Sequence, residues 1–248
     1  MSTLVLALLA GAVVGMALGA LGGGGSVLAV PALIYLLGFT PAAATTASLI
    51  IVTATSATAL YTHATSGNVR WRTGALFAAA GIPPAMAAAA LAARLPGQLL
   101  TAAFAAVAGL AALRMLTSPV PEDEVRPVRP VRAAGAGAGL GAVTGFLGVG
   151  GGFLAVPALV GVLGLRMRAA IGTSLLVITV NSLAALTVRT GGAGPLDWAV
   201  VAPFTGAAIL AARDGKRLSA AIKGPALQRI FAVVLLSVAA FMLTDAIR

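Results

Sequence analysis

Long apolar runs, broken by short polar or glycine-rich segments, make up most of this chain. Several runs approach 20 residues, the length at which a helix can cross a bilayer. Periodicity and helix-breaking residues predict helical segments, with ends uncertain by a few residues, at 3–21, 26–37, 42–61, 73–93, 98–116, 133–147, 153–163, 169–188, 198–212 and 227–246. The segments 26–37 and 153–163 are too short to cross.

Composition turns this pattern into a fold class. The chain is 60% hydrophobic and 9% charged, with a mean hydropathy of +1.05, whereas soluble domains are about half apolar and a quarter charged. An aromatic content of 5% and the long runs argue against outer-membrane strands. We therefore predict an all-α integral membrane protein. The run 3–21 is expected to stay in the mature protein, because no Lys or Arg precedes it as in a signal peptide.

The net charge of +10 would suggest a nucleic-acid partner in a soluble protein. Here the basic residues flank apolar segments, so they indicate membrane topology and lipid headgroup contacts, and no nucleic acid is expected. The chain has no cysteine and a single histidine, His63, which excludes thiolate and histidine-cluster metal sites. We expect no cofactor, no metal and no enzymatic activity.

The chain is internally duplicated. Residues 19–33 recur as 145–159, and the offset of 126 also relates Gly15 to Gly141 and Ser48 to Ser174. An offset of 127 relates Trp71 to Trp198 further along. Both tryptophans are expected at the membrane interface. The predicted division is a first transmembrane repeat at 1–117, a proline-rich cytoplasmic linker at 118–132 and a second repeat at 133–248.

The basic residues distinguish two topologies. If each half crosses four times, the 16 basic residues divide evenly between the two sides. If 3–37 and 133–163 are re-entrant hairpins, each half crosses three times, the repeats are inverted, and Arg94, Arg189 and Arg248 alone lie outside. The second arrangement has the expected cytoplasmic excess of Lys and Arg. We therefore predict two inverted repeats, each a glycine-tipped re-entrant hairpin plus three transmembrane helices, with both termini outside and the hairpin tips meeting near the midplane.

The glycine-rich tips are the predicted chemical centre. Glycine permits positive φ values and exposes backbone amides, and the helices that follow near Ser26 and residue 153 would present their N-termini to an anion. The alternative is close helix packing, which we favour for Gly15, Gly19, Gly141 and Gly145 because they are spaced by four. Pro31 and Pro157 are expected to break the short helices.

Polar residues on the next helix of each half could complete the site. They are Thr45, Thr46, Ser48, Thr53, Thr55 and Ser56 in the first half, and Thr173, Ser174, Thr179, Asn181 and Ser182 in the second. Each hydroxyl could instead bond its own helix carbonyl. No Asp, Glu, Lys or Arg lies clearly inside a crossing helix, and His63 is expected at the interface. The predicted substrate-binding residues are Gly22, Gly23, Gly24, Gly25, Ser26, Thr46, Ser48, Gly148, Gly150, Gly151, Gly152, Thr173, Ser174 and Asn181.

The paired motifs GGGGSVLAVPAL at 22–33 and GVGGGFLAVPAL at 148–159, with Ala47-Ser48-Leu49 and Thr173-Ser174-Leu175 at matching distances, resemble the TauE/SafE sulfite exporter family. The resemblance covers nearly the whole chain. It implies a permease for small sulfur-containing anions such as sulfite or organosulfonates. Val149 stands where the first tip has Gly23, and Gly152 where it has Ser26, so the two tips need not bind substrate equally.

The resulting hypothesis is a secondary transporter that exports such anions by alternating access around a midplane site. A passive anion channel and a transporter of the same fold for a non-sulfur anion are the alternatives. An intramembrane enzyme or scaffold is a third reading, which the lack of cysteine, paired carboxylates and a histidine cluster disfavours. The expected partners are a small anionic substrate and membrane lipid, with a homodimer left open, and the expected location is a prokaryotic inner membrane.

Overall fold

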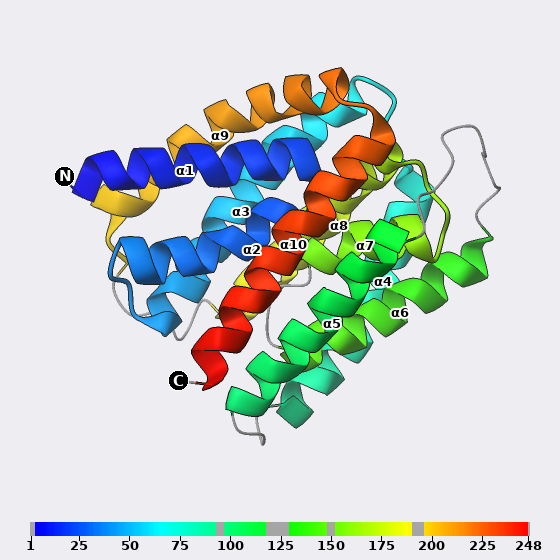
Figure 1. The fold of residues 1–248 in the computed structure, drawn as a ribbon, viewed down its shortest axis with the longest axis horizontal. Helices are drawn as coiled ribbons and strands as arrows, with labels where there is room; N and C mark the ends of the chain where they lie inside the picture. The colour runs from blue at the N-terminus through cyan, green and yellow to red at the C-terminus, as the bar shows by residue number, and fades with distance from the viewer. Residues whose placement is uncertain (1–2, 93–96, 118–128, 148–151, 190–195, 248) are drawn as a thin grey trace.

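The computed structural model describes residues 3–92, 97–117, 129–147, 152–189 and 196–247. Every regular element in these ranges is helical, so the predicted all-α fold is confirmed. In chain order they are α1 (Thr3–Leu21), α2 (Gly24–Pro31), η1 (Ala32–Leu36), α3 (Pro41–Ala64), α4 (Trp71–Ala92), α5 (Gly97–Thr117), α6 (Pro130–Leu147), α7 (Gly152–Gly161), α8 (Met167–Arg189), α9 (Trp198–Ala221) and α10 (Gly224–Ile247) (Figure 1).

Most helices begin and end within a few residues of the prediction, but α9 does not. It was expected to end at residue 212 and continues to Ala221, through Arg213, Asp214, Lys216 and Arg217. Charged residues end a hydrophobic pattern without ending a helix, since Arg and Lys are good helix formers. The side chains of Asp214 and Arg217 also pair at 3.1 Å, one turn apart.

The two short helices differ at their prolines. The chain passes directly from α2 into the π-helical turn η1 after Pro31, whereas α7 runs through Pro157 as far as Gly161. A proline removes one hydrogen-bond donor from the helix, and a π turn is one way of accommodating that loss. Only the first proline is followed by such a change.

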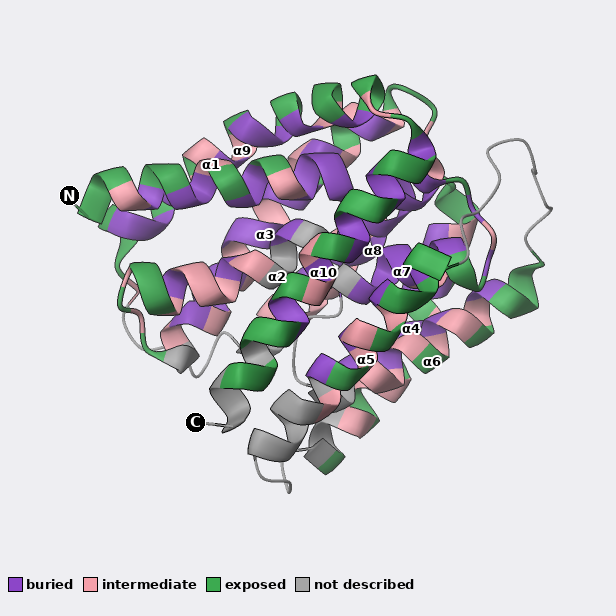
Figure 2. Ribbon diagram, viewed as in Figure 1, coloured by how far each residue is buried: buried purple, intermediate pink, exposed green. Residues whose placement is uncertain are grey.

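Four helices in the described part of the chain are long and apolar enough to cross a membrane: α1, α3, α8 and α10. Together with the composition, they make this a multi-pass membrane protein. Helix α1, which was predicted as one arm of a hairpin, is therefore itself long enough to span. Figure 2 shows exposed residues along the outer sides of α1, α9 and α10, with buried residues turned inward.

The first helix of each half packs against a helix of the other half. Helix α1 lies along α9, where a Cβ added to Gly11 would come within 2.3 Å of the Phe204 carbonyl oxygen. Helix α6 lies along α4 in the same way, and a Cβ added to Gly137 would come within 2.2 Å of the Phe77 carbonyl oxygen. These contacts are counterparts, because Gly11 and Gly137 are related by the offset of 126 and Phe77 and Phe204 by 127.

Two pairs of helices, α3 with α8 and α5 with α10, run in opposite directions. In α3 and α8, Thr179 donates to Ser56 at 2.9 Å, and Gly172, near the start of α8, approaches the carbonyl oxygen of Asn68, beyond the end of α3. In α5 and α10, Gln228 near the start of one helix donates to the carbonyl oxygen of Met115 near the end of the other, at 2.7 Å. Both of these pairs are thus antiparallel.

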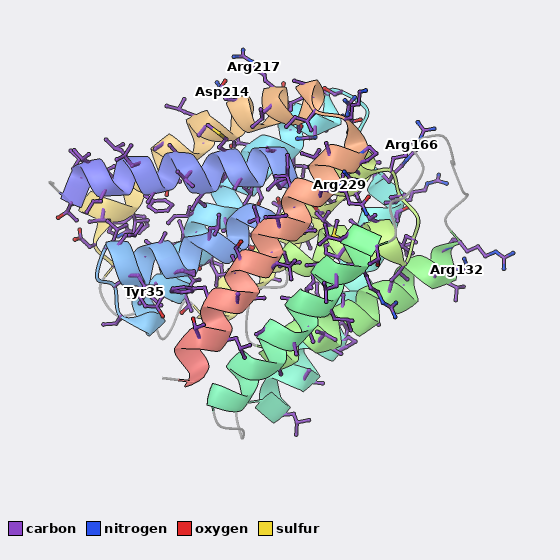
Figure 3. The ribbon with its side chains drawn as sticks, in the orientation of Figure 1. Tyr35, Arg132, Arg166, Asp214, Arg217 and Arg229 are labelled. Carbon is purple, nitrogen blue, oxygen red and sulfur yellow. The ribbon has the colours of Figure 1, made fainter. Side chains whose placement is uncertain are left out.

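Two arginines mark the end of the molecule that lies away from the chain termini. Figure 3 shows Arg132 and Arg166 toward the right of the view, whereas Tyr35 lies toward the left, the side on which Figure 1 marks both chain termini. Tyr35 packs edge-on against Phe241 of α10, with ring centroids 5.5 Å apart. The beginning of the chain and the beginnings of α6 and α8 therefore lie at opposite ends.

Candidate functional site

The first glycine-rich segment reverses the chain at one residue. Helix α1 ends at Leu21, and Gly22 adopts a φ of +69°, a value that side-chain-bearing residues rarely adopt. The Gly22 amide donates to the Leu18 carbonyl oxygen at 2.9 Å, which closes the last turn of α1. Gly23 already has a right-handed φ of −58° and precedes α2. In this segment, Gly22 is the position at which the backbone conformation itself calls for glycine.

The next element folds back along the first. A Cβ added to Gly25 would come within 2.4 Å of Leu18 Cβ and 2.6 Å of the Val14 carbonyl oxygen. Gly25 is therefore a packing residue of a tight α1–α2 hairpin. Helix α2 begins at Gly24 rather than near Ser26, and no side chain caps its first turn. Gly24 and Ser26 belong to α2, but their side-chain surroundings lie outside the described residues.

The hairpin tip contacts the other half of the chain. An ideal Cβ on Gly22 would lie 2.5 Å from Ser174 Oγ and 3.3 Å from the Ile171 Cα, both in α8. Ser174 is fully buried, and its hydroxyl donates to the Ile171 carbonyl oxygen at 2.8 Å. Two residues predicted for the site from different repeats, Gly22 and Ser174, thus lie in contact.

The other described residues predicted for the site have structural roles of their own. The Thr173 hydroxyl accepts a hydrogen bond from the Arg70 amide at 3.1 Å, and so ties the start of α4 to α8. Ser48, the counterpart of Ser174, is buried and donates to the Thr45 carbonyl oxygen at 2.8 Å. Thr46 is also buried. Gly152 is the buried first residue of α7, whereas Gly148, Gly150 and Gly151 lie outside the described residues.

The hairpin tip lies beside the ends of the neighbouring helices, whereas it was expected near the midplane. The ring of His63, in the last turn of α3, places Nε2 3.1 Å from the Gly19 carbonyl oxygen, one turn before the tip. Gly22 is therefore level with the end of α3 and the second turn of α8, not with their middles. His63 lies at the end of α3 and is 2% exposed, because α1 covers it.

A second polar group lies between α3 and α8. The hydroxyls of Thr179 and Ser56 are 2.9 Å apart. Each also lies within hydrogen-bond distance of a carbonyl oxygen of its own helix. Thr55 Oγ1 and Asn181 Oδ1 are buried without a hydrogen-bond partner. Thr55 and Asn181 are related by the offset of 126, and that relation was the signal that could have added Thr55 to the predicted site beside Asn181.

Within the described ranges, no group of three or more His, Cys, Asp or Glu side chains could hold a metal ion. The chemistry available at the tip is therefore that of backbone amides, hydroxyls and the nearby imidazole. Lys216 also approaches this region, since its ammonium group donates to the Thr62 carbonyl oxygen at the end of α3. Sequence reasoning missed Lys216, because α9 was expected to end before it.

Comparison with known proteins gives a consistent result. The family model "Sulfite exporter TauE/SafE" matches residues 7–242. Two proteins named "Probable membrane transporter protein", from Xylella fastidiosa strains 9a5c and Temecula1, are each 33% identical over 97% of this chain and 95% of their own length. No solved structure matches the chain significantly.

Proposed function

Because the chain belongs to the sulfite exporter TauE/SafE family, a family of membrane transporters, we propose that it exports small sulfur-containing anions such as sulfite or organosulfonates. The observation that carries this proposal is the contact between the Gly22 tip and Ser174. It joins a glycine turn of one repeat to a buried hydroxyl of the other, and transporter substrate sites are usually found at such repeat interfaces.

The groups at this contact suit an anion through their backbone. The first turn of α2 has amides that no side chain caps, and a helix N-terminus carries a partial positive charge. The hydroxyl hydrogen of Ser174 points to its own helix carbonyl, so in this state the side chain presents only lone pairs outward. In the proposal the amides bind first, and Ser174 rotates to donate as substrate arrives.

The proposed membrane arrangement is a pair of inverted repeats with re-entrant hairpins. The antiparallel order of α3 and α8, and of α5 and α10, supports the inversion. The close return of α2 along α1 supports the hairpin. With thirteen of 16 basic residues on the linker side, both termini lie outside the inner membrane of a prokaryote and the linker lies in the cytoplasm.

The packing of helices from one half against helices of the other supports alternating access. The pairs α1–α9 and α4–α6 meet backbone to backbone, since a Cβ on Gly15 would reach within 2.1 Å of the Ala208 carbonyl oxygen, and one on Gly141 within 2.0 Å of the Gly81 oxygen. Such close backbone contacts leave no room for one helix of a pair to slide along the other. We therefore infer that each pair moves as a unit, and that their relative motion opens the hairpin tip to one side at a time.

A thermal-unfolding screen of the purified protein tests the substrate. Candidate ligands are sulfite, thiosulfate, sulfoacetate, taurine, sulfate and simple carboxylates. A true substrate at a hundred times its dissociation constant should stabilise the protein by about 2.7 kcal/mol. Ser174→Ala should weaken that stabilisation. Ser237→Ala is the matched control, because Ser237 makes the same kind of bond to its own helix at 3.0 Å but is exposed. The proposal fails if only non-sulfur solutes stabilise the protein.

A further inference from the structure

Histidine is the side-chain type whose unperturbed charge change falls near neutral pH, and His63 is the single histidine of a sequence without cysteine. It is 2% exposed. Its Nε2 lies 3.1 Å from the Gly19 carbonyl oxygen, and because a carbonyl only accepts, Nε2 carries the hydrogen. The other ring nitrogen, Nδ1, is buried and has no hydrogen-bond partner. In a neutral His63, the lone pair on Nδ1 is therefore buried and accepts no hydrogen bond.

Lys216 is the charged side chain that reaches the end of α3 next to this imidazole. Helices α1 and α2 contain no ionisable side chain, and Tyr35 of η1 is exposed. From α8, the exposed Arg168 donates to the Ala220 carbonyl oxygen at 3.0 Å. On α9, Lys216 donates to the Thr62 carbonyl oxygen, while Arg213 is exposed and Asp214 and Arg217 are paired in solvent. Within the described residues, no carboxylate can neutralise a protonated His63.

A buried imidazolium beside Lys216 therefore needs an anion from outside the chain. Isolated buried charges are strongly disfavoured, and a paired anion removes much of that cost. The Gly22 tip, where the proposed anion site lies, follows Gly19 by less than one helical turn, about 5 Å along the axis. The ring that would become charged and the site that would take the opposite charge are thus neighbours.

We propose that His63 is the proton site of the transporter, and that its protonated form is paired with the transported anion. This inference rests on the anion-transport function proposed above. In the step, Nδ1 takes a proton from solvent hydronium and forms an N–H bond, while Nε2–H keeps its bond to Gly19. A monoanion then binds at the tip beside His63 and Lys216. Proton and anion bind with mutual preference, so one proton and one negative charge cross together.

The internal duplication gives a histidine at this position in the first half but not in the second. The offset that relates Ser48 to Ser174 relates His63 to Arg189. The first repeat therefore has a titratable base where the second has a permanent cation. This asymmetry suggests His63→Arg as an informative variant, because it supplies the fixed charge that the sequence itself uses at the matching position.

The test measures methanesulfonate binding by the purified protein from about pH 5.5 to 8.5, where this probe stays a monoanion. Affinity should fall by about tenfold per pH unit above the histidine titration range. His63→Gln can still donate to Gly19 but cannot take a proton, so its affinity should be weak and independent of pH. His63→Arg should also lose the pH dependence. Tyr61→Phe, an exposed phenol on the same helix end, should behave as the wild type.

A second measurement needs no variant. Adding methanesulfonate to weakly buffered wild-type protein near pH 8 should take up about one proton for each anion bound. Absence of uptake, a wild-type affinity that does not change with pH, or a pH dependence that survives in His63→Gln would overturn the inference, while sulfonate binding itself would leave the proposed function standing. If only a non-sulfur anion binds, the substrate assignment fails, and the role of His63 is judged with that anion by the same criteria.

Discussion

Gly22 combines two demands that no other residue type meets. Its φ of +69° disfavours any side chain, and a Cβ would lie 2.5 Å from Ser174 Oγ. Gly22→Ala should lower the free energy of unfolding by about 1–2 kcal/mol for the backbone alone, and by more because of the contact. Gly38→Ala is the matched control, since Gly38 has a φ of +70° and nothing within 4 Å. Equal losses in denaturant unfolding would contradict the contact.

Thr55 shows that not every buried polar group serves stability. Its hydroxyl has no partner although the side chain is fully buried. Thr55→Val keeps the shape and removes the unsatisfied group, so the free energy of unfolding should rise by about 1 kcal/mol. Thr53→Val should have the opposite sign, because it removes a 2.6 Å bond to the Leu49 carbonyl oxygen. A loss of stability in Thr55→Val, measured by thermal unfolding, would mean that a partner satisfies this hydroxyl.

At the scale of elements, the swapped pairs α1–α9 and α4–α6 depend on glycine. A Cβ on Gly141 would lie 2.0 Å from the Gly81 carbonyl oxygen, and a backbone atom cannot give way as a side chain does. Gly141→Ala should destabilise the protein by about 1–3 kcal/mol. Gly139→Ala, two residues away on the open face of α6, has nothing within 4 Å and should be neutral or stabilising by up to about 1 kcal/mol. Similar melting temperatures for the two variants would contradict this packing.

Most helices could be predicted from sequence because a bilayer-length apolar run leaves few alternatives. The duplication indicated Gly22 and Ser174 as site residues, because each glycine tip is followed by a serine at a fixed distance, Ser48 in the first half and Ser174 in the second. The contact of Gly22 with Ser174, from the other half, depends on how the helices pack and could not be predicted from the duplication. The burial of His63 could not be predicted in this way. It depends on α1 covering the end of α3, and on α9 reaching the same place through a charged stretch that hides its helical continuation.

At the scale of the whole molecule, the two topologies place the linker differently relative to the N-terminus. Three crossings per half put them on opposite sides, whereas four put them on the same side. The natural chain has no cysteine, so Thr3→Cys and Val131→Cys each introduce a single thiol, at two exposed positions. A membrane-impermeant maleimide should label Thr3→Cys in intact cells and Val131→Cys only after permeabilisation. Labelling of both from one side would contradict the inverted arrangement.

The central claim is that this protein carries sulfur-containing anions by alternating access, and counterflow in proteoliposomes tests it most directly. Vesicles loaded with excess unlabelled sulfite are diluted into a trace of radiolabelled sulfite. An alternating-access carrier exchanges one for the other, so the label should accumulate transiently above equilibrium inside wild-type vesicles, and Gly22→Ala should suppress the overshoot. Label that only rises to equilibrium would indicate a channel, and no sulfite-dependent entry alongside exchange of another anion would contradict the substrate.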